Sequence, residues 1–152
     1  MHNWFECKVR YDKTLDTGLI KAVTEPYLVD AFSFTEAEAR IIEEIRPFIT
    51  GEFSIANIKR VKFSDTFFND TGDRYFKAKL YYITLDEKSG TEKKTAVNML
   101  IQATTINEAL ETVENEMKQT MIDYSIAAIT ETPIMDVFMY GGENKTEKEE
   151  WV

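Results

Sequence analysis

The side chains best suited to chemistry in this sequence are aromatic and basic residues that alternate in WFECKVRY and YFKAKLYY. In an expected strand, alternate residues share one face. Aromatic rings stack on nucleic-acid bases at about 1–3 kcal/mol per base, while Lys and Arg contact phosphates. The pattern therefore predicts a sheet face for single-stranded nucleic acid, most plausibly DNA. The predicted binding residues are Trp4, Lys8, Arg10, Lys59, Arg60, Lys62, Tyr75, Lys77, Lys79 and Tyr81.

An ordinary structural role explains the same residues, because aromatics and lysines are common on any sheet. Trp4, Tyr75 and Tyr81 could be buried against the rest of the fold. The exposure of Trp4 and Tyr75 separates two functions. Exposed rings beside bases favour nucleic acid, whereas buried rings with an exposed carboxylate face favour an acidic protein–protein adaptor or inhibitor, including a DNA mimic.

The last twelve residues, GGENKTEKEEWV, have no periodic pattern, and residues 141–152 are expected to form a flexible acidic tail. Such a tail resembles those of bacterial and phage single-stranded-DNA-binding proteins. That resemblance implies contact with a replication or recombination protein through Glu149, Glu150, Trp151 and Val152. A purely solubilising tail is the alternative.

Enzyme signatures are sparse, and we expect neither an enzyme nor a cofactor. The one histidine, His2, lies at the terminus, and Cys7 falls on the expected inward face of the first strand. No glycine-rich phosphate-binding motif occurs. A metal-dependent nuclease stays open as a third function, and it requires several carboxylates to converge, from the set Asp65, Asp70, Asp73, Asp86 and Glu92.

Charge and composition favour a globular cytoplasmic protein with no membrane segment. The formal net charge is −9, and the expected helical stretches 35–49 and 107–121 hold eight acids and three bases. No apolar run approaches the roughly 18 residues of a membrane span. The N-terminus lacks the layout of a signal peptide, and one cysteine suits a reducing compartment.

The sequence contains an internal repeat of one unit, present in two consecutive copies. With a shift of 71 or 72 residues, WFECKVRY lies over YFKAKLYY, VDAFSFTEA over IQATTINEA, and FSIANI over YSIAAI. The repeat predicts an α+β fold, β-β-α-β twice, with mainly antiparallel sheet, two helices on one face and pseudo-twofold symmetry. We expect a single duplicated domain over 1–140, with repeats of about 1–70 and 71–140. A homodimer is compatible with this arrangement.

Helix signals place the caps at Thr35 and Asn107. The inward residues are then expected to be Ala39, Ile42, Ile45 and Ile49 in the first helix and Ala109, Leu110, Val113, Met117 and Met121 in the second. Extended segments are expected over 52–68 and 124–140, the latter interrupted at Pro133. Pro47 predicts an irregular last helical turn.

Nearly the whole chain resembles a family of uncharacterised small proteins from Bacteroides-type bacteria and their phages. The resemblance is carried by VTEPYLVDAFSFTEAEARIIEE, by WFECKVRY before it and by TLDEKSGTEKKTAV after it. The family is classed as a domain of unknown function, so the resemblance implies no activity and no catalytic residues. It implies an intracellular setting linked to phage or mobile-element DNA.

Overall fold

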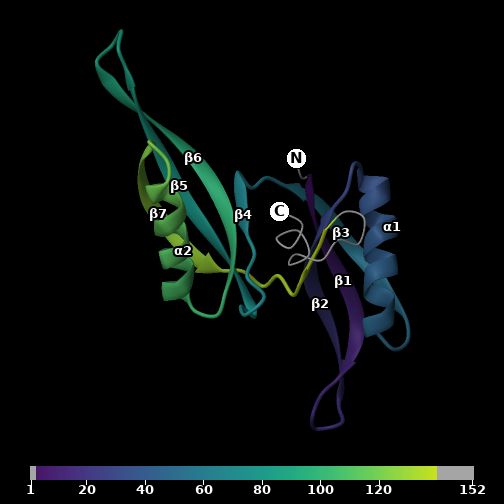
Figure 1. Ribbon diagram of the computed structural model, residues 1–152. Coiled ribbons are helices and arrows are strands. Elements are labelled where there is room, and N and C mark those ends of the chain that lie inside the picture. The colour runs from purple at the N-terminus through teal and green to yellow at the C-terminus, as the bar shows by residue number, and fades with distance from the viewer. Residues whose placement is uncertain (1–2, 140–152) are drawn as a thin grey trace, which may run out of the picture. The chain divides into compact units, whose positions relative to one another are not determined.

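The computed structural model describes residues 3–139. Within that range the protein is a mixed α+β fold with two helices and two four-stranded, mostly antiparallel sheets (Figure 1). The chain divides into two compact units. Of the described residues, unit 1 comprises 3–62 and 133–139, and unit 2 comprises 63–132.

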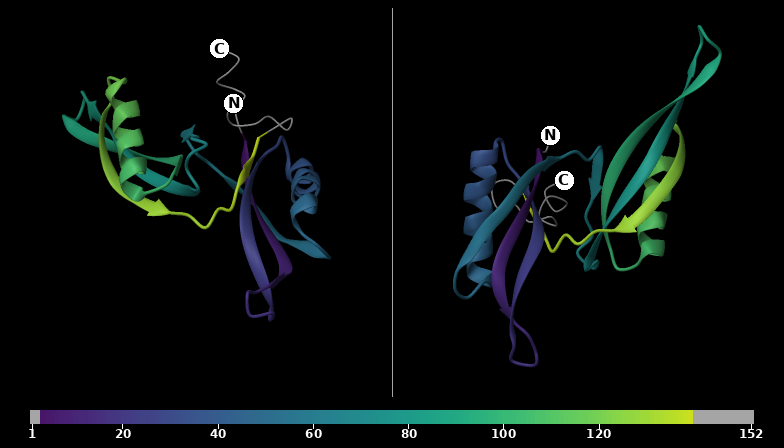
Figure 2. Two further views of the ribbon diagram at one scale, coloured as in Figure 1. Left: turned by 60° about the horizontal axis from the view of Figure 1, so that its bottom comes forward. Right: turned by 180° about the vertical axis from the view of Figure 1, so that it is seen from behind.

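Unit 1 consists of a helix on one face of a sheet, with strand order β3-β1-β2-β8. Strand β8 runs parallel to β2, and the other pairs are antiparallel. Helix α1 lies along the sheet in both views of Figure 2. The elements are β1 (Trp4–Thr14), β2 (Ile20–Asp30), α1 (Phe34–Ile45), a 3₁₀ turn (Arg46–Phe48), β3 (Phe53–Val61) and β8 (Val137–Phe138).

Unit 2 has the same layout, with strand order β4-β6-β5-β7 and α2 on one face. Strand β4 runs parallel to β6. The elements are β4 (Asp65–Phe67), β5 (Arg74–Asp86), β6 (Thr91–Ala103), α2 (Ile106–Lys118) and β7 (Asp123–Glu131).

The two units agree in the details of their strand pairing. A β-bulge interrupts β1–β3 pairing between Lys8 and Val9, and another interrupts β5–β7 pairing between Lys79 and Leu80, 71 positions later. In each unit the short parallel strand comes from the segment that follows the last long strand of the other unit: β4 follows β3, and β8 follows β7. Val29 pairs with Phe138 in one unit, and Ile101 pairs with Phe67 in the other.

The expected long extended segments are each two strands in different sheets, which corrects the sequence-based assignment. Segment 52–68 contains β3 in unit 1 and β4 in unit 2, and segment 124–140 contains β7 in unit 2 and β8 in unit 1. Sequence patterns report that a segment is extended, but they do not report which edge it pairs with.

The N-caps of both helices lie two residues before the expected ones. The Ser33 hydroxyl accepts a hydrogen bond from the Glu36 amide, and the Thr105 hydroxyl accepts one from the Glu108 amide, each at 3.1 Å. The expected caps, Thr35 and Asn107, are therefore wrong. Ser33 and Glu36 have the same spacing as Thr35 and Glu38, so spacing alone does not choose between the two positions.

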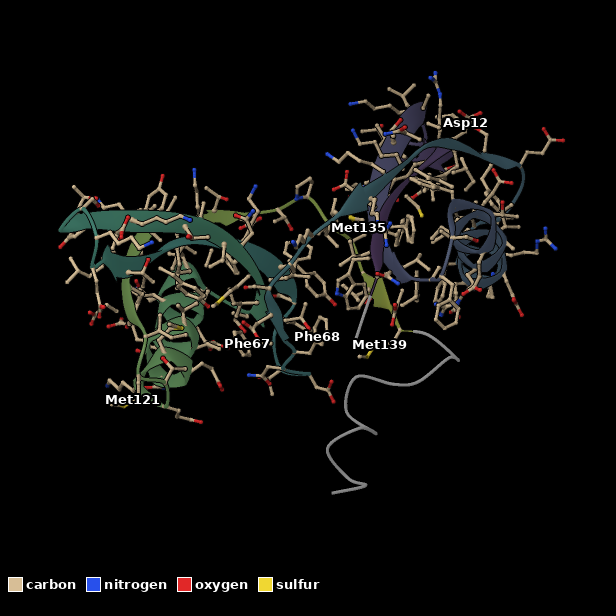
Figure 3. The ribbon with its side chains drawn as sticks, turned by 90° about the horizontal axis from the view of Figure 1, so that it is seen from above. Asp12, Phe67, Phe68, Met121, Met135 and Met139 are labelled. Carbon is tan, nitrogen blue, oxygen red and sulfur yellow. The ribbon has the colours of Figure 1, made fainter. Side chains whose placement is uncertain are left out.

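The helix residues that enter the cores agree with the expected ones for Ala109, Val113 and Met117 in α2, but only for Ile45 in α1. In α1 the buried residues are Ala37, Ile41 and Ile45, whereas Ile42 is only half-buried. In α2 the buried residues are Ala109, Val113 and Met117, and Met121 beyond the helix is fully exposed (Figure 3). The irregular turn at Pro47 is confirmed as the 3₁₀ segment.

The cores lie between each helix and the helix-side face of its sheet. Phe5, Cys7 and Val9 of β1 pack in the core of unit 1, and Phe76 and Leu80 of β5 pack in that of unit 2. Alternate residues of β1 and β5 therefore lie on the helix-free faces.

No helix among residues 3–139 combines the length and the apolar character that crossing a membrane requires.

Candidate binding surfaces

The helix-free face of each sheet was expected to expose aromatic rings, and for two of the three rings this is wrong. Trp4 and Tyr75 are each only 3% exposed. On the paired strands, the neighbouring Leu28 and Leu100 are 0% exposed. The helix-free face is thus buried and apolar at the N-terminal ends of β1 and β5. The two rings are not available to stack on nucleic-acid bases.

Further along β5, the helix-free face of unit 2 becomes open and basic. Lys77 and Lys79 are exposed and Tyr81 is half-buried. The Lys79 ammonium lies 5.4 Å from the centroid of the Tyr81 ring, which is cation–π distance. The residues paired with Lys79 and Tyr81 are small or polar: Asn98, Ala128, Ala96 and Ser125. The long basic side chains and the one aromatic ring therefore project beyond the small side chains of the neighbouring strands.

The corresponding face of unit 1 carries bases interspersed with acids. Lys8, Arg10 and Lys59 are exposed on it. Lys59 pairs directly with Glu6, and Asp12 follows Arg10 on the same face of β1. Figure 3 labels Asp12 in the hairpin. The bases are brought together as expected, but the neighbouring carboxylates reduce their net positive charge.

The basic run at the end of β3 is divided between two faces. Lys59 lies on the helix-free face, whereas Arg60 pairs with Phe5 and its guanidinium carbon lies 5.8 Å from the centroid of that core ring. Its Nη2 also donates a 3.1 Å hydrogen bond to Asn3 Oδ1. Lys62 lies just beyond the strand and is exposed. Arg60 is therefore not part of one continuous basic surface with Lys59.

The solvent faces of the two helices are acidic. Glu38, Glu43, Glu111 and Glu114 are exposed, and the remaining four helix carboxylates, Glu36, Glu44, Glu108 and Glu116, are half-buried. Within the helices the bases are Arg40 in α1 and Lys118 in α2. Negative charge thus gathers on the helix side of each unit, whereas the helix-free face is basic in unit 2 and of mixed charge in unit 1.

Arg40 has a structural role that the sequence did not reveal. Its guanidinium donates to the backbone carbonyl oxygens of Asp30 and Met139, and Nη2 lies 3.9 Å from Glu44 Oε1. A lone arginine in an acidic helix gave no signal of this contact with residues far along the chain.

The groups that could support catalysis are dispersed or protected. Cys7 is 0% exposed, and burial raises the pKa of its thiol from 9.0 to about 12, so the nucleophilic thiolate is suppressed at neutral pH. Residues 3–139 contain no group of three or more His, Cys, Asp or Glu side chains arranged to hold a metal ion. The convergence that a metal-dependent nuclease would require of Asp65, Asp70, Asp73, Asp86 and Glu92 is therefore not found among these residues. His2 and the tail residues Glu149, Glu150, Trp151 and Val152 lie outside the described residues.

Residues 3–140 match the family described as Domain of unknown function (DUF4494), and the chain belongs to that family. No curated protein and no solved structure matches it.

Proposed function

We propose that this protein is a non-enzymatic adaptor or inhibitor that presents the acidic faces of α1 and α2 to a basic partner. The observation that carries the proposal is the burial of Trp4 and Tyr75 in a protein whose eight helix carboxylates all reach solvent to some degree. A DNA mimic, which occupies the phosphate-binding surface of its target, is one form of this proposal.

The spacing of the α2 carboxylates supports the proposal of a basic partner. Glu108, Glu111 and Glu114 follow one another at three-residue intervals, which places neighbouring like charges on one side of the helix. Each such pair destabilises an isolated helix by roughly 0.2–0.5 kcal/mol. A basic partner would relieve this repulsion, and the only base within α2 is Lys118.

The proposal is tested with a fluorescein-labelled peptide of alternating lysine and glycine, titrated by anisotropy. The double variant Glu111→Gln/Glu114→Gln should weaken binding several-fold. Asp70→Asn/Asp73→Asn removes the same charge from an exposed turn and is the matched control. If both double variants weaken binding equally, attraction comes from net charge and the acidic-face proposal is wrong.

A second function, single-stranded nucleic-acid binding, is favoured by one specific observation. Lys77, Lys79 and Tyr81 form an open row on the helix-free face of unit 2. One ring and two lysines provide a smaller site than the sequence predicts, with Lys8, Arg10 and Lys59 on unit 1 as further phosphate contacts. Nucleic acid held through phosphates must bind less tightly as salt rises.

Anisotropy of a labelled thirty-nucleotide single strand at low and moderate salt tests this second function. Lys77→Gln/Lys79→Gln should weaken binding, whereas Lys88→Gln/Lys93→Gln, which removes equal charge from the β5–β6 hairpin away from this row, should have little effect. A chain truncated after Tyr140 should bind more tightly if the tail shields the basic face. Affinity that does not change with salt would overturn this function. The proposed phage or mobile-element setting depends on the family resemblance.

We also propose that the two halves arose by tandem duplication. Support comes from their common β-β-α-β order, from bulges 71 positions apart, and from the equivalent pairing of β8 and β4 with the second strand of each unit. Pseudo-twofold symmetry remains a prediction from the repeat.

A further inference from the structure

A groove of about 690 Å³ lies between α1 and β3 in unit 1. Three half-buried apolar residues line it: Ile42, Phe53 and Ile55. The volume lies within the roughly 300–1,000 Å³ of typical ligand sites. The groove can therefore accept at least one large apolar side chain.

The helix residue that lines this groove differs between the two units, which indicates that an apolar groove is not a feature that the fold requires. Ile42 is the ninth residue of α1, and the ninth residue of α2 is Glu114. Phe53 and Ile55 correspond to Tyr124 and Ile126 under the 71-residue shift. The ninth helix position therefore carries an apolar residue in unit 1 and an exposed charged residue in unit 2.

The edge of β3 beside the groove is suited to a partner strand. Among the described residues, β3 pairs with β1 alone. The bulge at Ala56 disturbs the strand beyond Ile55, but Phe53, Ser54 and Ile55 pair in regular register before it. Edge strands bind extended peptides by main-chain hydrogen bonds, while side-chain pockets provide the specificity.

The rim of the groove is more acidic than basic. Glu38 and Glu52 are exposed lining residues, and Arg46 is the one base among the residues that line the groove. Glu43, exposed on the same helix, adds to the negative charge. Basic residues on either side of an apolar anchor would meet these carboxylates.

We propose that this groove binds an extended basic segment of a partner protein, which adds as a strand to the edge of β3 and inserts one large apolar side chain between Ile42, Phe53 and Ile55. The inference rests on the proposed adaptor function and names the chemistry of its partner. Glu38 and Glu52 select lysine or arginine beside the anchor.

Three labelled peptides of one length test the inference by anisotropy. The first alternates lysine with glycine, the second carries a central Phe in that background, and the third carries the same Phe in a glutamate background. The Phe-containing lysine peptide should bind at least tenfold more tightly than either of the others. Amide shifts on titration should be largest at residues 52–56 and along the Glu38–Ile42–Arg46 side of α1.

The matched variants are Ile42→Glu and Ala39→Glu. Ile42→Glu installs the residue that α2 has at the same position, and Ala39→Glu adds the same charge to an exposed site on α1 outside the groove. Ile42→Glu should reduce binding of the Phe-containing peptide to the level of the peptide without Phe, and Ala39→Glu should change it less than twofold. Amide spectra of both variants should retain the dispersion of the wild-type spectrum, which is the control for folding.

The possible failures are distinguishable. If the central Phe adds no affinity, or if both variants act alike, the groove inference is overturned while the adaptor proposal stands. If neither lysine peptide binds, both fail. Equal binding of the glutamate-background peptide overturns the selection of basic residues. A concentration-dependent dimer that Ile42→Glu dissociates without peptide would show that a second copy occupies the groove, which also overturns the inference.

Discussion

Arg40 donates a hydrogen bond to the backbone carbonyl oxygen of Met139, 99 residues further along the chain. The same guanidinium donates to the carbonyl of Asp30 at the end of β2. One side chain of α1 therefore connects the helix, the second strand and the segment that carries β8, all within unit 1.

The first prediction concerns this contact. Arg40→Met should destabilise unit 1 by about 1–3 kcal/mol, because the carbonyls of Asp30 and Met139 lose a charged donor. Amide hydrogen exchange should accelerate most at residues 134–139. Arg46→Met, at an exposed position after α1, is the control and should leave that exchange unchanged. Equal protection of residues 134–139 in both variants would show that Arg40 does not hold the segment.

The second prediction concerns Gly72 in the turn before β5. A Cβ atom at this position would lie 2.7 Å from the Cα and backbone nitrogen of Ala103. The buried Gln102 amide also donates a 2.9 Å hydrogen bond to the Gly72 carbonyl, so the turn cannot move away freely. Gly72→Ala should therefore lower stability by about 1–3 kcal/mol, as overpacking does.

Chemical denaturation of Gly72→Ala measures this loss. Asp70→Ala, an exposed change in the same turn, should alter the free energy of unfolding by less than about 0.5 kcal/mol. A Gly72→Ala protein as stable as the wild type would mean that the turn and β6 do not approach each other this closely.

The third prediction is a loss of stability at alkaline pH. Burial raises the pKa of the Cys7 thiol from 9.0 to about 12, and the hydrogen bond that Tyr11 donates to Glu25 raises its pKa from 10.0 to about 12. Burial similarly raises the pKa of Tyr27 to about 12. Between pH 9 and 12 the unfolded chain binds fewer protons than the folded chain, so stability must fall as pH rises.

The melting temperature should therefore not vary through the ionisation of these groups below pH 8, where all three are protonated in both states, and it should fall between pH 9 and 12. Tyr11→Phe removes one of the three groups and should make the decline above pH 10 shallower. Absorbance at 295 nm follows tyrosine ionisation directly. Native tyrosines that titrate near pH 10 throughout would contradict the raised values.

The fourth prediction separates the observed helix caps from those that spacing suggests. Ser33→Ala and Thr105→Ala should each cost about 1 kcal/mol, because the Glu36 and Glu108 amides lose their acceptors. Thr35→Ala and Asn107→Ala should cost markedly less. The free energy of unfolding from urea titration measures all four, and the reverse ranking would return the caps to Thr35 and Asn107.

The sequence alone determined the kinds of local structure and their order. Alternation along Phe5, Cys7 and Val9 indicated a half-buried strand, and all three are in the core. The α+β class and the near repetition of β-β-α-β could be read because helical and strand periodicities are local properties of the chain. The acidic helix surfaces could be read for the same reason.

Only the tertiary structure decided how those segments pair and which surfaces remain open. The division of segment 52–68 between two sheets, the burial of Trp4 and Tyr75, and the separation of Lys59 from Arg60 all depend on contacts with distant residues. Alternation assigns a residue to one of two faces, but it does not say what covers that face. The α1–β3 groove arises in the same way, because its lining comes from two elements whose approach is fixed by packing rather than by local sequence.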